Sequence, residues 1–96
     1  MVVLVIDRSS GDRSWRKSRR TLASVMFPVL KRVFVGSLSK RVFEQLLDEL
    51  RKNASRSTAL VVLFEKKSGY RGWQMVFIGS RKLLDPRWLP FLEFEK

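Results

Sequence analysis

With 96 residues, the chain has room for one domain but not for two. Hydrophobic residues make up 45% of it, enough to form a core, which argues against a disordered basic tail. It contains no cysteine and no histidine. The sequence therefore excludes a disulfide framework, a thiol nucleophile, and histidine as a general base or zinc ligand.

Positive charge dominates the composition, because 20 Lys and Arg residues against nine Asp and Glu residues give a net charge of +11. Residues 1–41 hold ten of the basic residues and only two acids, so they carry +8, while residues 42–96 carry the remaining +3. A charge this far from zero repels itself in a compact fold and is typical of proteins that bind polyanions. No segment approaches the ~20 apolar residues of a membrane span, and the N-terminus lacks the order of a signal peptide. We therefore expect a cytoplasmic protein whose polyanion is nucleic acid.

The first half of the chain predicts a strand, a helix and a second strand. Val2–Ile6 is a continuous apolar, β-branched run, which is typical of a buried strand. From about Ser14 to Val29 the spacing of Leu22, Val25, Met26 and Val29 predicts an amphipathic helix. Pro28 should end or kink this helix near its last turn. Lys31–Leu38 predicts the second strand.

The second half predicts a helix followed by strands. A stripe of apolar residues capped by Ser37 or Ser39 indicates the helix: Val42, Phe43, Leu46, Leu47 and Leu50. Thr58–Phe64 and Tyr70–Ile78 predict two strands joined by a turn at residues 66–69, and residues 86–96 a last strand or tail. The order β-α-β-α-β-β-β predicts a single α+β domain over residues 1–96. It would be a two-layer sandwich with both helices on one face of a mainly antiparallel sheet of four or five strands.

Two basic clusters are candidates for contacts with nucleic acid. The first surrounds the start of the first helix and contains Arg13, Arg16, Lys17, Arg19 and Arg20. Cations there oppose the helix dipole, which indicates that they serve a partner outside the fold. The second cluster, Arg81 and Lys82, follows a strand and is interpreted either as a further phosphate contact or as a polar turn. Neither cluster has a base-reading motif, so we expect binding to be largely independent of sequence and steeply dependent on salt.

Asp7 and the three tryptophans are the remaining candidate functional residues. Asp7 ends the first strand, where two copies facing across a dimer axis would hold one Mg²⁺, or where a single Asp would start a turn. All three tryptophans are candidates for base stacking, and Trp15 lies among arginines. Trp73 and Trp88 are interpreted as core or interface residues.

The order and spacing of several segments together form a pattern. A hydrophobic first strand precedes a basic-led helix, and Val33-Phe-Val-Gly-Ser-Leu-Ser39 runs directly into a second helix. Later come an apolar strand, the hairpin segment Ser68-Gly-Tyr-Arg-Gly-Trp-Gln74, Gly79 before a basic pair, and an apolar tail. In this order and spacing nearly the whole chain resembles the Cas-two family of CRISPR-associated proteins, most closely its type I-E branch.

The resemblance implies a ferredoxin-like fold and a homodimer that bridges dimers of the CRISPR integrase during spacer acquisition, a step of antiviral defence. Duplex DNA would lie along this assembly and be contacted on its backbone. The positions that touch DNA in the type I-E branch are held here by Lys17 and Arg19, and by Arg81 and Lys82. The C-terminal tail of that branch helps to dock the integrase, which implies this role for Trp88, Leu89, Phe91, Leu92 and Phe94.

Many members of the family are described as metal-dependent nucleases that use an Asp at the end of the first strand, the position of Asp7. Three hypotheses therefore stand. The favoured one is a non-catalytic scaffold for duplex DNA that needs no cofactor for binding. The first alternative is a metal-dependent endonuclease of DNA or RNA that uses Asp7 from both subunits and Mg²⁺. The second is a general RNA-binding protein of ribosomal type.

Overall fold

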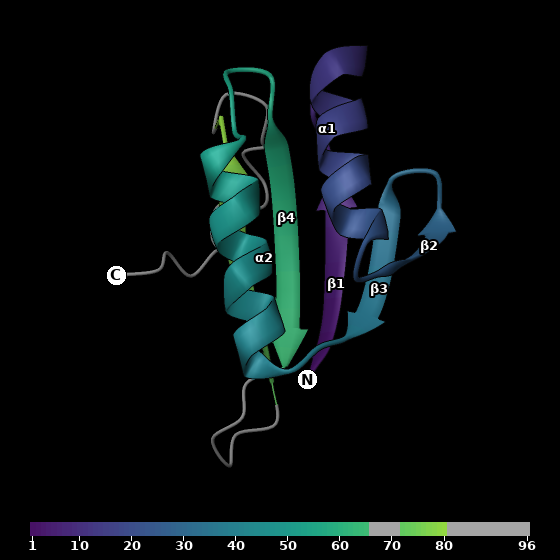
Figure 1. Cartoon of the computed structure of the whole chain (residues 1–96), viewed down its shortest axis with the longest axis vertical. Coiled ribbons are helices and arrows are strands. Elements are labelled where there is room, and N and C mark those ends of the chain that lie inside the picture. The colour runs from purple at the N-terminus through teal and green to yellow at the C-terminus, as the bar shows by residue number, and fades with distance from the viewer. Residues whose placement is uncertain (66–71, 81–96) are drawn as a thin grey trace.

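In the computed structural model, which describes residues 1–65 and 72–80, two helices cover one face of a five-stranded antiparallel sheet (Figure 1). The elements in chain order are β1 (Val2–Asp7), α1 (Asp12–Ala23), β2 (Phe27–Leu30), β3 (Val33–Ser37), α2 (Lys40–Lys52), β4 (Ala59–Glu65) and β5 (Trp73–Gly79). The strand order is β2-β3-β1-β4-β5. The first four strands and both helices have ferredoxin-like connectivity, and β5 extends the sheet at one edge. The predicted α+β two-layer sandwich is confirmed.

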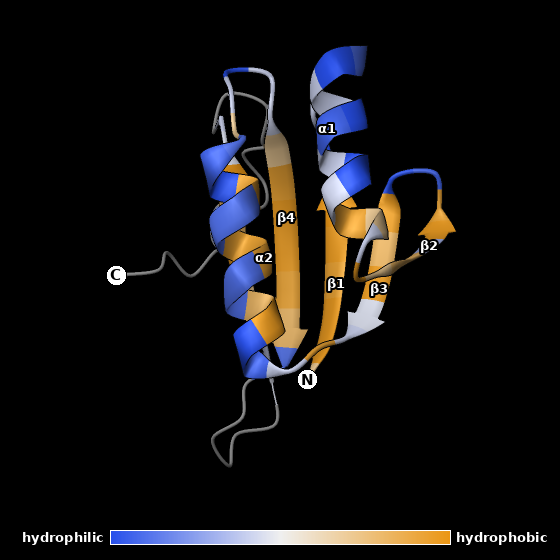
Figure 2. Ribbon diagram, viewed as in Figure 1, coloured by the Kyte–Doolittle hydropathy of each residue, from blue (hydrophilic) through white to orange (hydrophobic). Residues whose placement is uncertain are grey.

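The core lies between the helices and the middle of the sheet, where the hydropathy of the strands is highest (Figure 2). β1 is central because it pairs with β3 on one side and with β4 on the other. Val3 and Val5 on its helix-facing side are fully buried, with Phe34 of β3 and Leu60 of β4 beside them in the same cluster. The continuous apolar run at the N-terminus therefore forms a central strand, as its composition predicts.

Helix α2 follows the sequence prediction closely. The Ser39 hydroxyl accepts a hydrogen bond from the backbone N–H of Val42 at 3.2 Å, so Ser39 is the N-cap. Phe43, Leu46, Leu47 and Leu50 are buried against the sheet, and Val42 is half-buried beside them. The apolar stripe thus fixes which side of α2 faces the sheet, and its acidic side faces away.

The prediction of one helix from Ser14 to Val29 is wrong. Helix α1 ends at Ala23, and Phe27–Leu30 is strand β2, which pairs with β3 through an irregular register. Pro28 disfavours helical geometry at Phe27, and pairing with β3 makes this segment a strand. The Ser24 hydroxyl also donates a hydrogen bond of 2.6 Å to the carbonyl of Thr21 at the end of the helix. The element order of the described part is therefore β-α-β-β-α-β-β, with a short strand that the sequence pattern does not reveal.

Strand β5 pairs along β4 and is the outermost described strand on that side of the sheet. Val76 and Ile78 face the helices and are buried, whereas Met75 and Phe77 lie on the other face and pack with Ile6 against Val61. The predicted turn at residues 66–69 and the predicted last strand or tail at residues 86–96 lie outside the described residues. Among the described helices, neither is long and apolar enough to cross a membrane.

Candidate nucleic-acid interface

Helix α1 turns its basic side chains away from the sheet. It begins directly after Gly11, whose φ of 80° lies in the left-handed region that favours glycine. Trp15, Ser18 and Leu22 form the buried stripe. Because successive residues are ~100° apart around the helix axis, the remaining sides of α1 carry the basic side chains. All five basic residues predicted on this helix are exposed: Arg13, Arg16, Lys17, Arg19 and Arg20.

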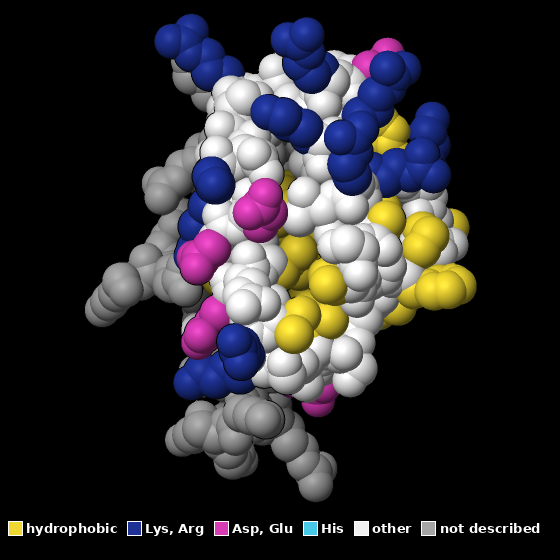
Figure 3. All heavy atoms as spheres, in the orientation of Figure 1, with side chains coloured by type: hydrophobic (Ala, Val, Ile, Leu, Met, Phe, Trp, Pro, Cys, Tyr) yellow, Lys and Arg dark blue, Asp and Glu magenta, His cyan; other side chains and the backbone are white. Residues whose placement is uncertain are grey.

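The fold brings further cations to the end of the molecule where α1 begins. β1 and β2 both run toward this end, α2 ends there, and β4 starts there (Figure 1). Loops that are far apart in the sequence therefore become neighbours, and Figure 3 shows Lys and Arg side chains gathered over this end. We call the following set the basic end: Arg8, Arg13, Arg16, Lys17, Lys31, Arg32, Arg51, Lys52 and Arg56.

The two serines Ser14 and Ser55 join α1 to the loop after α2. Their hydroxyl oxygens lie 3.2 Å apart, so either serine can donate to the other. Beside this contact is a hollow of about 530 Å³, lined by Arg51, Ala54, Ser55, Arg56, Phe77, Ile78, Gly79 and Ser80. The contact places Arg56 next to the start of α1, a neighbour that the sequence alone does not reveal.

The last described residues of the chain also lie at the basic end. Gly79 has a φ of 110°, and a Cβ there would overlap the carbonyl of Thr58. The N–H of Ser80 donates to that same carbonyl at 2.7 Å. Arg81 and Lys82 follow directly in the sequence but lie outside the described residues, so their contact with nucleic acid stays a prediction.

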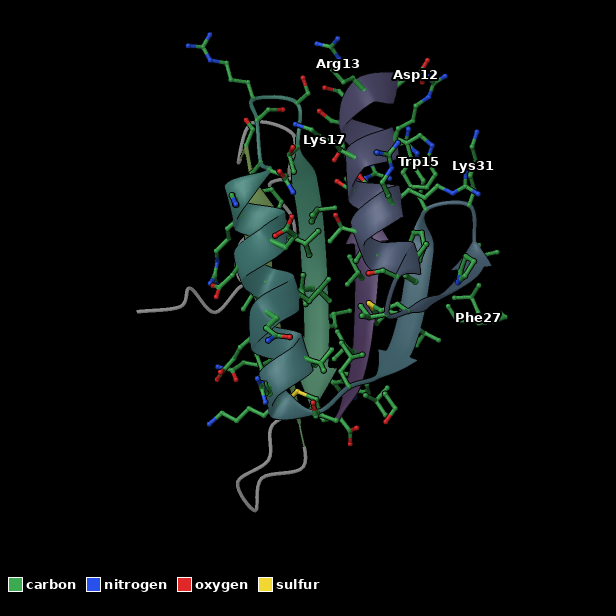
Figure 4. All side chains as sticks on the ribbon, in the orientation of Figure 1. Asp12, Arg13, Trp15, Lys17, Phe27 and Lys31 are labelled. Carbon is green, nitrogen blue, oxygen red and sulfur yellow. The ribbon has the colours of Figure 1, made fainter. Side chains whose placement is uncertain are left out.

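Exposed acids in the described part of the chain lie mostly away from the basic end. Glu44, Asp48 and Glu49 are on the outer side of α2, and Glu65 is at the opposite end of the sheet, where it accepts a hydrogen bond from the N–H of Val2 at 2.7 Å. Two exposed acids among the described residues border the basic end: Asp12 in the first turn of α1 (Figure 4) and Glu49 near the end of α2, which accepts a hydrogen bond from Asn53 at 3.2 Å. The charge is therefore polarised along the molecule, which attracts a polyanion to one end.

Asp7 is a buried carboxyl rather than an exposed one. Its side chain is on the helix-facing side of β1, like Val3 and Val5, and the residue is 1% exposed. Oδ1 accepts a hydrogen bond of 2.8 Å from the N–H of Ser9, and Oδ2 is buried without a hydrogen-bond partner. Burial raises the pKa of Asp7 above its ordinary value, while the hydrogen bonds from Ser9 and the charge of Arg32 oppose this rise.

This geometry does not fit a magnesium site. Mg²⁺ requires near-octahedral oxygen ligands and usually retains several waters, so its carboxylate ligands must be accessible. Asp7 is closed off beneath α1, and no group of three or more Asp or Glu side chains comes together among the described residues. The bond from Ser9 instead matches the alternative interpretation, an Asp that starts a turn.

The tryptophans divide between interior and surface. Trp15 is 8% exposed and packs near Phe34, with 6.4 Å between the ring centroids, so it belongs to the core. Trp73 is 58% exposed in the described structure, so it is not a core residue, and its role at an interface stays a prediction. Trp88 lies outside the described residues.

The fold and this site define a small ferredoxin-like domain whose cations are concentrated at one end. Residues 1–85 match the sequence model of a family described as CRISPR-associated protein (Cas_Cas2CT1978), and the chain therefore belongs to this Cas-two family. The family resemblance predicted from the sequence is confirmed. A search of curated proteins finds no match to the chain.

Proposed function

We propose that this Cas-two protein is a homodimeric scaffold that holds duplex DNA by its phosphate backbone for the CRISPR integrase during spacer acquisition. The observation that carries the proposal is the basic end, where cations from α1, the β2–β3 turn and the loop after α2 converge. Membership of a CRISPR-associated family supports a role in a CRISPR system.

The kind of contact follows from the chemistry of the basic end. Its exposed side chains are Lys and Arg on a helix surface and in loops, which suit phosphate oxygens. In the described part of the chain both helices are connected through strands and not as a helix-turn-helix, so the proposal includes no reading of bases. Affinity then comes from counterion release and falls steeply as salt rises.

The face of the sheet away from the two described helices supports a second copy as partner. Both described helices cover the other face, so Ile6, Met75 and Phe77 remain only half-buried around Val61. Trp73 at the start of β5 adds an exposed aromatic side chain. Two copies related by a two-fold axis would bury these apolar groups against each other and present two basic ends to one duplex.

The C-terminal part of the chain completes the proposal. Arg81 and Lys82 follow Ser80 at the basic end, so they would add phosphate contacts next to Arg56. The apolar residues predicted to dock the integrase are Trp88, Leu89, Phe91, Leu92 and Phe94. We expect their loss to weaken the contact with the integrase and to leave duplex binding by the free dimer unchanged.

The proposal is tested by co-expression with the integrase, followed by size-exclusion chromatography with and without duplex DNA. We expect co-elution of both proteins and a larger complex once duplex is added. The double variant Arg13→Glu, Arg56→Glu should still co-elute with the integrase but should fail to retain the duplex. Retention of duplex by this variant would place the DNA on another surface.

A comparison of nucleic acids separates this proposal from a general RNA-binding role. DNA and RNA duplexes of the same sequence are titrated into the free dimer, and the cell extract is fractionated for ribosomes. If the protein is a DNA scaffold, we expect it to bind the DNA duplex tightly and to migrate with the integrase. Migration with ribosomes and preference for RNA would support the RNA-binding alternative.

A further inference from the structure

A second hollow lies between α1 and the edge strand β2. Its volume is about 410 Å³, which is within the range of sites that hold small molecules. It is lined by Trp15, Arg19, Pro28, Val29, Leu30 and Lys31. Figure 4 shows Trp15 and Lys31 near each other, between α1 and the turn that joins β2 to β3.

Two guanidinium groups lie over the indole ring of Trp15. The Arg32 guanidinium carbon lies 4.9 Å from the ring centroid, and that of Arg19 lies 5.9 Å from it. Arg32 is held further by a hydrogen bond of 2.7 Å from Nη1 to the carbonyl of Ser9. Trp15 is itself fixed by burial near Phe34. Arg32 is thus held against one side of the hollow's tryptophan, and Arg19, which lines the hollow, lies over the same indole ring.

The other wall of the hollow is apolar and exposed. Val29 is 57% exposed and Leu30 is 68% exposed, and both lie on a strand that pairs only with β3. Apolar groups of this size beside fixed cations suit a ligand with a planar apolar part and an anionic part. A nucleotide has this chemistry, because its base stacks on aromatic or guanidinium planes and its phosphate binds Arg or Lys.

We propose that this hollow binds an unpaired nucleotide of the nucleic acid held at the basic end. The base would stack on the guanidinium plane of Arg19, against Leu30, and the phosphate would bind Lys31. Trp15 would support the Arg19 guanidinium from beneath. The inference rests on the proposed DNA-binding function and deepens it, because it adds recognition of single-stranded nucleotides to the holding of a duplex.

The test compares a blunt DNA duplex with the same duplex carrying a short single-stranded 3′ end of thymidines. We expect about fivefold tighter binding of the duplex with the single-stranded end, in line with the stacking of one base. Leu30→Asn should abolish this preference and leave the affinity for the blunt duplex unchanged. Phe27→Asn is the matched control, because Phe27 is 73% exposed on the same strand but does not line the hollow.

The fluorescence of Trp15 reports directly on binding at the hollow. The chain has three tryptophans, so the double variant Trp73→Phe, Trp88→Phe leaves Trp15 alone. We expect its fluorescence to be quenched by the duplex with the single-stranded end and to change little with the blunt duplex, at equal saturation.

The outcomes separate the two proposals. Equal affinity and equal quenching for both duplexes, with steep dependence on salt, would overturn the nucleotide site and leave the scaffold proposal standing. Absence of binding to either duplex would overturn both. If Leu30→Asn instead releases the integrase and keeps the preference for the single-stranded end, the hollow is a protein-docking site and the inference is wrong.

Discussion

Arg16→Gln isolates the contribution of one phosphate contact. Arg16 is exposed on α1 at the basic end, and Arg and Gln have similar helix propensities, so the fold should survive. The matched control is Gln45→Glu on the exposed side of α2. Both substitutions lower the net charge by one, so a difference between them reports position rather than total charge.

The magnitude follows from counterion release. Each phosphate neutralised on B-DNA contributes a slope of about 0.9 to the fall of log K with log salt. A homodimer loses two such contacts in the Arg16→Gln variant, so the slope should become shallower by about 1.8. Over a fourfold rise in salt, the variant should therefore lose about 12-fold less affinity than the wild-type protein loses.

The assay is fluorescence anisotropy with two duplexes of unrelated sequence, titrated at several salt concentrations. We expect the same shallower slope on both sequences for Arg16→Gln, and the wild-type slope for Gln45→Glu. Equal effects of the two substitutions would show that binding depends on net charge and not on the basic end. Circular dichroism checks that both variants fold.

Three further substitutions test the local structure. Asp7→Asn should raise the melting temperature at pH 7, because burial raises the pKa of Asp7 in the folded protein. As pH rises, Asp7 ionises in the unfolded chain before it ionises in the folded protein, so stability falls between the unfolded and the folded pKa. The advantage should disappear at a pH below the unfolded carboxyl pKa, and a lower melting temperature at pH 7 would show that the Asp7 charge is stabilising. Gly79→Ala should destabilise the protein more than Gly11→Ala does, because both glycines have positive φ but only at Gly79 would a Cβ overlap a carbonyl, that of Thr58. We expect Gly11→Ala to lower the free energy of unfolding by about 1–3 kcal/mol. Chemical denaturation of both variants shows which loses more stability. Ser39→Ala should cost about 1 kcal/mol through loss of the N-cap, whereas no change in the denaturation midpoint would remove the capping role.

Long periodic segments were predictable from the sequence because burial alone determines them. The stripe of α2 from Phe43 to Leu50 and the central strand β1 follow directly from apolar spacing. β2 was not predictable in this way, because Val25, Met26 and Val29 continue the helical spacing of Leu22. Pro28 was the one local signal against a helix there, and pairing with β3 decides the outcome.

The candidate site was predictable only where it is continuous in the sequence. The basic cluster of α1 was visible, but Arg56 and Lys31 join it through strand order, which the sequence pattern does not specify. The burial of the Asp7 side chain was likewise not predictable from the sequence. Its position at the end of a strand suggested a metal ligand, and only the direction of its side chain under α1 shows a buried turn residue.

The most direct test of the basic end uses the absence of cysteine from the chain. Ser10→Cys at the basic end and Ser37→Cys at the opposite end of the sheet, both exposed positions, are each labelled with an iron chelate that cleaves nearby DNA. We expect cleavage of the bound duplex from position 10 and little or none from position 37. Stronger cleavage from position 37 would show that the duplex lies at the other end of the molecule.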